Sequence, residues 1–290
     1  MRKRRGGRIL RILGIALIIV ALALLGGFAY MKLQEHREMR TQYKLQQMFE
    51  STGSIGRRSW FDLFGASALA EEGEHRISVR LAELYEINPD LIGWLIAGED
   101  ISTPIVLRDN EYYLNHDFYG KSSNSGTVFA DARNMNWESD NYVVLYGHNM
   151  KNGTMFGKLK LYAESEYFKN SSCVEIHSLY DDVVTAYVPF AVIDASMDAS
   201  GADYLDLRCF DLFEGGDAAA IQAQIDLLLE RSMYAIPGLA VDSSDRIVAL
   251  ATCSYDLADG RFILFCRALR EGESAQQMET LIRENAVRRD

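Results

Sequence analysis

The sequence has few cysteines and lacks the spacing by which cysteines bind zinc or carry out dithiol chemistry. Its four cysteines, Cys173, Cys209, Cys253 and Cys266, are irregularly spaced, and no two form a Cys-x-x-Cys pair. We therefore expect no metal site and no cofactor. An even number of cysteines still allows two disulfides outside a cell, so a structural role for each one remains open.

Positive charge is scarce beyond the first eleven residues. Those eleven hold six basic side chains and no acidic one, whereas the whole chain has 30 basic and 41 acidic residues. The rest of the chain is therefore more acidic than the overall net charge of −11. Such a surface repels nucleic-acid phosphates, which argues against a nucleic-acid partner.

Charge is absent from Ile12 to Met31, a run of twenty residues that could cross a bilayer as a helix. Basic flanks stay in the cytoplasm, so we predict a cytoplasmic tail at 1–11, a transmembrane helix at 12–31 and an extracellular remainder. A cleaved signal peptide is the alternative, but the apolar run is too long for the core of one.

After the apolar run, the pattern predicts a stalk and linker over 32–76 and a folded domain over 77–290. Apolar residues at three-to-four spacing predict a helix from Ile77 to Ile87, which Asn88-Pro89 ends. Further helices are expected within 154–167 and from Asp217 to Arg231. Eight β-type runs indicate a mainly antiparallel barrel or sandwich. They cover 93–97, 104–107, 126–130, 141–147, 174–179, 182–194, 246–252 and 261–269.

Cys253 is the cysteine whose position best suits a nucleophile. It follows an apolar strand at the point where polar residues begin, so the sheet would hold it while leaving it open to substrate. Cys266 alternates with Phe262 and Leu264 on one side of a strand and is expected in the core. Cys173 and Cys209 show no reason to be reactive.

His148 likewise ends an apolar strand, and two such strand ends can meet at one rim of a barrel. A Cys–His pair there would serve acyl transfer, with the imidazole as acid and base. Arg261 begins the strand after Cys253 and would lie opposite it in a hairpin, where its guanidinium could stabilise an oxyanion. For His116 we expect a structural hydrogen bond, and for His177 a place on the surface of a strand.

These residues also carry a resemblance to a known family. Thr252-Cys253 after an apolar strand, with Arg261 eight residues beyond the cysteine, resembles the signature of sortases, and VVLYGHNM resembles their histidine strand. The stretch from 88 to 134, GTMFGKLKLY at 153–162 and the helix at 217–231 are similar to class B sortases. The resemblance covers about residues 77 to 270.

The resemblance implies an eight-stranded sortase barrel tethered to the membrane of a Gram-positive cell. Such an enzyme cleaves a sorting motif of surface proteins after Thr, holds a thioester, and transfers it to an amine of peptidoglycan or of a pilin. It implies Cys253 as nucleophile, His148 as acid and base, and Arg261 as stabiliser of the intermediate. The substrate-binding residues would be Asn110, Leu114, Ala251 and Thr252, although Ala251 stands where class B members often carry Ser.

Two other interpretations remain open at this stage. A papain-like cysteine hydrolase also uses Cys and His, but it usually places the cysteine before the histidine, the reverse of the order here. An anchored, catalytically silent domain that binds a surface partner would not need Cys253 at all. The sequence gives neither the sorting motif, nor the substrate protein, nor the acceptor amine.

Overall fold

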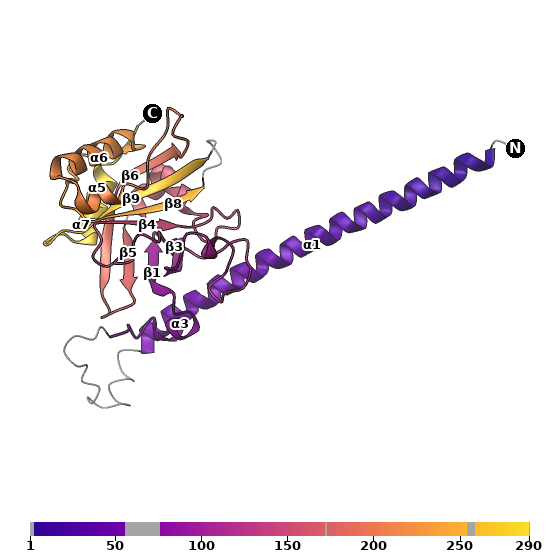
Figure 1. The fold of residues 1–290 in the computed structure, drawn as a ribbon, viewed down its shortest axis with the longest axis horizontal. Helices are drawn as coiled ribbons and strands as arrows, with labels where there is room; N and C mark the ends of the chain where they lie inside the picture. The colour runs from indigo at the N-terminus through magenta and orange to yellow at the C-terminus, as the bar shows by residue number, and fades with distance from the viewer. Residues whose placement is uncertain (1–2, 56–75, 172, 254–258, 290) are drawn as a thin grey trace. The chain divides into compact units, whose positions relative to one another are not determined.

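Residues 12–31, predicted as a transmembrane helix, lie within the helix α1, Lys3–Ile55, of the computed structural model (Figure 1). The structure describes residues 3–55, 76–171, 173–253 and 259–289, and the chain divides into two compact units, Met1–Thr41 and Gln42–Asp290. Leu17, Leu24 and Phe28 are among the exposed apolar side chains of α1. This helix is therefore long and apolar enough to cross a membrane.

Eight strands close into a barrel in the second unit, as the eight β-type runs predicted. Going around the barrel, the order is β1-β2-β3-β4-β8-β9-β6-β5. Two neighbouring pairs, β2–β3 and β4–β8, are parallel, and the others are antiparallel. The strands are β1 (Leu91–Ala97), β2 (Ile101–Val106), β3 (Phe129–Ala130), β4 (Tyr142–Tyr146), β5 (Val174–Ser178), β6 (Val184–Ser196), β8 (Ile247–Cys253) and β9 (Gly260–Ala268).

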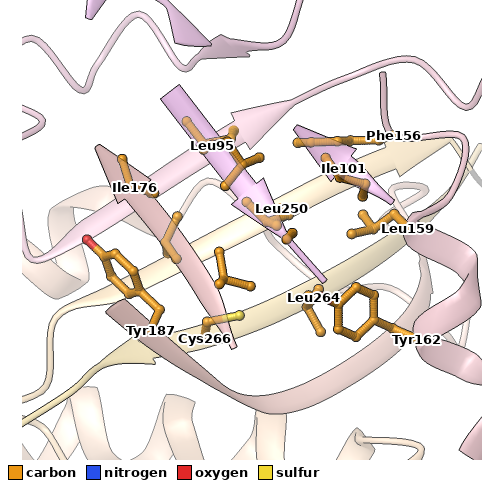
Figure 2. Close-up of a cluster of buried hydrophobic side chains, with 14 of the residues drawn as sticks. Leu95, Ile101, Phe156, Leu159, Tyr162, Ile176, Tyr187, Leu250, Leu264 and Cys266 are labelled. Atoms are coloured by element: carbon orange, nitrogen blue, oxygen red, sulfur yellow. The ribbon is translucent and has the colours of Figure 1, made fainter. Parts of the chain in front are cut away.

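Side chains that alternate along these strands supply two separate apolar clusters. Leu250 and Leu264 belong to the cluster that fills the barrel, together with Cys266, as predicted for this cysteine (Figure 2). Ala249 and Ile263 belong to a second cluster on the outer face of the same strands. Because successive residues of a strand point to opposite faces, the strand that delivers Cys253 is buried on both sides.

Helices α5 (Phe210–Gly215) and α6 (Ala218–Arg231) cover the outer cluster. The helix predicted from Asp217 to Arg231 is confirmed as α6, and the Asp217 side chain caps it by accepting a hydrogen bond from the Ala220 amide at 2.8 Å. The short helices expected within 154–167 are η2 (Leu159–Ala163) and α4 (Ser165–Asn170). Several elements were not predicted: α5, η1 (Tyr112–Leu114), α7 (Ala275–Asn285) and the paired strands β7 (Tyr234–Ala235) and β10 (Val287–Arg288).

The helix predicted from Ile77 was too long, because α3 covers only Ala82–Ile87. The residues before α3 pair with the turn between β5 and β6 instead. Ile77 forms a bridge with Tyr180, and the Ser78 amide donates to the Leu179 carbonyl at 2.7 Å. These contacts hold residues 77 and 78 in an extended pairing instead of a helix.

The compact unit begins at Gln42, earlier than the predicted start of the folded domain at 77. The cause is the last part of α1, where Leu45 and Phe49 are buried. The Phe49 ring stacks on Trp94 of β1 at 4.5 Å and meets the His177 ring edge-on at 5.1 Å. His177 is therefore buried, and its predicted place on the strand surface was wrong.

Candidate active site

His148 and Cys253 are brought together by two parallel strands. Strand β4 pairs with β8 so that Tyr146 lies opposite Ala251, and the Gly147 amide extends the pairing by donating to the Ala251 carbonyl at 3.2 Å. Parallel strands end at the same edge of a sheet, so the residue after Gly147 and the last residue of β8 reach the same rim. The prediction that these two strand ends meet is confirmed.

The chain on either side of His148 is bonded directly to the segment that carries Cys253. Before the histidine, the Thr252 hydroxyl donates to the Gly147 carbonyl at 2.7 Å. After it, the Asn149 side-chain amide donates to the Cys253 carbonyl at 2.8 Å. The main chain of His148 is thus held on both sides, by one hydrogen bond to Thr252 and by another to Cys253.

Arg261 lies directly opposite Cys253 in the antiparallel pair β8–β9, which confirms the predicted hairpin register. Side chains of residues opposite each other in a sheet lie on the same face. That face is the outer one, because Ala251, two residues before Cys253, belongs to the outer cluster. The predicted turn between these strands lies partly outside the described residues, which resume at Asp259, a residue in the left-handed conformation with φ of 49°.

The ring of His148 contacts the turn η1 (Tyr112–Leu114). Its Nε2 atom lies 2.8 Å from the main-chain oxygen of Leu114. A carbonyl oxygen only accepts hydrogen bonds, so Nε2 carries a proton in this arrangement. The ring is therefore oriented by a residue that is far from it in the sequence.

The other three cysteines are poor candidates for a nucleophile. Burial raises the pKa of Cys173 to about 12 and that of Cys209 to about 11. Cys266 is completely buried in the barrel interior, and burial raises the pKa of its thiol as well (Figure 2). All four cysteines lie within the described residues and are free thiols. Cys253 is partly exposed, and it is the cysteine beside a histidine and an arginine.

The four residues expected to bind substrate occupy different environments. The Leu114 side chain is exposed, whereas Asn110 accepts a hydrogen bond from the Ala132 amide at 2.8 Å. Ala251 and Thr252 are buried, with Ala251 in the outer cluster and the Thr252 hydroxyl bonded to Gly147. Their role toward a substrate stays a prediction.

His116 has the structural role that was expected of it. Its Nδ1 atom lies 2.8 Å from the Tyr112 carbonyl, and its ring stacks on the Tyr112 ring at 4.1 Å. Among the described residues, no cluster of three His, Cys, Asp or Glu side chains could hold a metal ion.

The buried carboxylate of Asp131, near Ala251, was not predicted from the sequence. Tyr146, the residue paired with Ala251, donates from its hydroxyl to Asp131 at 3.1 Å. Burial opposes ionisation of Asp131, but hydrogen bonds from Arg133 and Tyr146 outweigh it and hold the pKa of this carboxyl below its usual range. The Arg133 guanidinium also lies 4.0 Å above the Phe210 ring of α5. Only the spacing of Asp131 and Arg133 could have suggested this ion pair.

Comparison with known proteins gives relatives of one kind. Sortase B of Listeria monocytogenes is 30% identical over 198 residues, which cover 66% of this chain and 74% of that protein. Sortase B of Staphylococcus aureus is 27% identical over 186 residues, covering 62% of this chain and 66% of that protein. No protein-family model matches the chain.

The fold points the same way. The structure of a Staphylococcus aureus sortase B–substrate complex aligns with a TM-score of 0.63 at 20% identity, over 83% of this chain and 100% of the other. The shared barrel, the identity to the Listeria protein and the extent of that match lead to one conclusion: the chain belongs to the class B sortases, which are cysteine transpeptidases.

Proposed function

We propose that this protein cleaves a sorting motif in surface proteins after Thr and transfers the Thr acyl group to an amine, with Cys253 as nucleophile. The observation that carries the proposal is the register of three strands. It sets Cys253 opposite Arg261 on β9 and beside the end of β4, where His148 follows. These are the residue types that a thiol acyl transfer requires: a nucleophile, an acid and base, and a cation at the oxyanion.

The reaction consists of two balanced steps. Cys253 passes its thiol proton to His148 and attacks the Thr carbonyl carbon, so that a C–S bond forms, and the C–N bond breaks as His148 gives that proton to the leaving amine. In the second step the incoming amine attacks the thioester carbon, a C–N bond forms, and the C–S bond breaks while His148 takes the proton from the amine. Arg261 stabilises the oxyanion in both steps, because its planar guanidinium offers several N–H donors on the face that carries the thiol.

Membership of the family supports a proposal for the substrate and for the acceptor. A structure of the Staphylococcus aureus relative is a complex with substrate, and we infer a sorting-motif peptide as the substrate here. The acceptor amine is assigned to a peptidoglycan cross-bridge or to a pilin lysine. Asn110, Leu114, Ala251 and Thr252 are proposed to border the peptide, either through their side chains or through their main chain.

The apolar helix supports a place in the cell membrane. We propose that residues 12–31 span the bilayer, that the basic residues 1–11 stay in the cytoplasm, and that the barrel faces the cell wall. Alkylation of single engineered cysteines by a membrane-impermeant reagent on intact cells tests this orientation. Labelling of a cysteine placed at residue 5 would contradict it.

The experiment that tests the reaction uses the full chain in detergent with a library of NPxTx and xPxTG peptides, with and without an amine. Mass spectrometry should detect a thioester on Cys253, and the amine should convert it into a new amide. Cys173→Ala serves as the control, because it removes a half-buried thiol away from the proposed site and should keep the activity. No adduct on Cys253 with any peptide would sink the proposal and favour a silent binding domain.

A papain-like hydrolase is no longer a competing explanation, because the fold is a closed barrel and the relatives are sortases. Hydrolysis remains the outcome when water replaces the amine. The ratio of amide to free acid in the same experiment measures how far the enzyme prefers transfer.

A further inference from the structure

The orientation of His148 depends on a main-chain group and on the glycine that leaves room for it. We propose that the Leu114 carbonyl orients the His148 ring for proton transfer, and that Gly126 is the residue whose missing side chain allows this. The proposal rests on the role of His148 described above and adds two positioning residues to it.

The contact between the ring and the carbonyl selects one tautomer. Nε2 lies 2.8 Å from the Leu114 oxygen, which accepts, so the proton of the neutral ring resides on Nε2. Nδ1 is then the nitrogen that can take a proton from the incoming amine. A histidine base that is oriented by a fixed acceptor on its other nitrogen is a general arrangement in acyl-transfer enzymes.

The hydrogen bonds around His148 do not by themselves fix its ring. Those from Thr252 and Asn149 hold the neighbouring main chain, but the ring can still rotate about its two side-chain torsions. The Leu114 carbonyl acts on the ring itself. It therefore supplies the restraint that the neighbouring residues cannot.

The turn that carries this carbonyl is firmly held. Asp109 accepts hydrogen bonds from the amides of Glu111 at 2.9 Å and Tyr112 at 2.6 Å. Tyr113 is buried, and its hydroxyl lies 2.7 Å from the carboxylate of Asp90. These bonds tie the first and the middle residue of the turn, so the Leu114 oxygen that follows them has little freedom to move.

Gly126 lies directly against the turn. It adopts the left-handed conformation with φ of +59°, and a Cβ added there would lie 2.3 Å from the Tyr113 oxygen and 3.0 Å from the Leu114 oxygen. The next residue, Thr127, donates from its amide to the same Tyr113 oxygen at 3.0 Å. Both close contacts are backbone atoms, so a side chain at position 126 must displace the turn relative to this position and disturb the Leu114 oxygen that contacts His148.

The test is Gly126→Ala in the full-length chain in detergent, with ¹⁵N-labelled histidine. We expect kcat to fall about 10- to 100-fold, since a displacement of about 1 Å has effects of this size, while KM stays within about threefold. The ¹⁵N shifts of the His148 ring should move from the Nε2–H tautomer toward a mixture. A loss of rate with unchanged ring shifts would count against the proposal, as would unchanged kcat.

Two glycines provide matched controls for backbone strain. Gly120 also has positive φ, at +71°, but its added Cβ would meet only the end of the Tyr112 side chain, at 3.3 Å. Gly272, with φ of +85°, has nothing within 4 Å of an added Cβ. Gly120→Ala and Gly272→Ala should keep kcat within about twofold and leave the ring shifts unchanged. If they lose as much activity as Gly126→Ala, strain alone explains the effect and the proposal fails.

A second variant keeps the proposal testable if Gly126→Ala does not fold. Tyr113→Phe removes the hydroxyl that ties the turn to Asp90 and leaves the backbone able to adopt its conformation. It should lower kcat several-fold and shift the His148 ring signals in the same direction. Wild-type kcat and ring signals in folded Tyr113→Phe would overturn the proposal.

The two proposals can fail separately. If the wild-type enzyme forms no thioester, the proposed reaction fails, yet the ring shifts of the resting protein still report whether Leu114 selects the tautomer. If the thioester forms normally in folded Gly126→Ala, the reaction stands and the positioning role of Gly126 is refuted.

Discussion

The side-chain amide of Asn149 donates a hydrogen bond of 2.8 Å to the main-chain carbonyl of Cys253. The residue that follows the proposed acid and base is thereby tied to the proposed nucleophile. The bond links the ends of two parallel strands at the point where their regular pairing stops. Together with the bond from the Thr252 hydroxyl to the Gly147 carbonyl, it sets the distance between the main chain at His148 and that at Cys253.

Asn149→Ala is expected to lower kcat/KM by about 10- to 100-fold, because it releases the loop after His148 from β8. Asn149→Asp should be no better, since a carboxylate cannot donate to a carbonyl and would repel it. The measurement is the rate of thioester formation on Cys253. Asn152→Ala, in the same loop, is a suitable control, because its amide oxygen is bonded to Thr154 and not to β8. Full activity in Asn149→Ala would show that the bond is dispensable.

Arg261→Lys should lower turnover strongly and leave the fold unchanged. Lysine keeps the charge at the position opposite Cys253 but loses the planar fork of N–H donors. We expect a loss of about 100-fold in kcat, the size found when an oxyanion donor is removed, with an unchanged thermal midpoint. The control is Arg283→Lys on the exposed face of α7. A near-normal rate would remove Arg261 from the mechanism.

The fold was predictable to the extent that it depends on local alternation and on caps. The eight β-type runs and the helix after Asp217 carry their signals within a few residues, and both were found. The start of the domain was not predictable in this way. Leu45 and Phe49 lie in a charged, helix-prone segment, and their burial depends on apolar partners that are distant in the sequence, such as Trp94 on the barrel.

In the candidate site, too, the features with a local sequence signal were predictable and those that depend on distant packing were not. Strand ends placed Cys253, His148 and Arg261 together, because β-register can be inferred from polar residues that follow apolar runs. The Leu114 carbonyl and the glycine beside it could not be inferred. Main-chain groups carry no identity in a sequence, and their approach depends on how a distant turn packs.

His177 makes the stability of the protein depend on pH. Burial lowers the pKa of this side chain, with Arg80 acting in the same direction and Glu175 against it. The unfolded chain, with a usual pKa of about 6.5, therefore binds a proton that the folded chain resists. The resulting loss of unfolding free energy is absent above the pKa of the unfolded chain and grows as the pH falls below it. The protein therefore becomes less stable on acidification.

Replacement of His177 by Phe removes this proton and should flatten the change in unfolding free energy between about pH 7 and pH 5. The measurement is urea unfolding of both proteins across this range. His36→Gln is the control, because that histidine is exposed. Parallel pH profiles for wild type and His177→Phe would show that His177 does not contribute.

Thr252 has two possible roles that one pair of variants separates. The resemblance to sortases suggests contact with substrate, whereas its buried hydroxyl donates to the Gly147 carbonyl at 2.7 Å. Thr252→Val keeps the shape and removes the donor, which should cost about 1–3 kcal/mol of stability and lower kcat. Thr252→Ser keeps the donor and should restore both. A change confined to KM, with wild-type stability, would assign Thr252 to the substrate instead of to the link between β4 and β8.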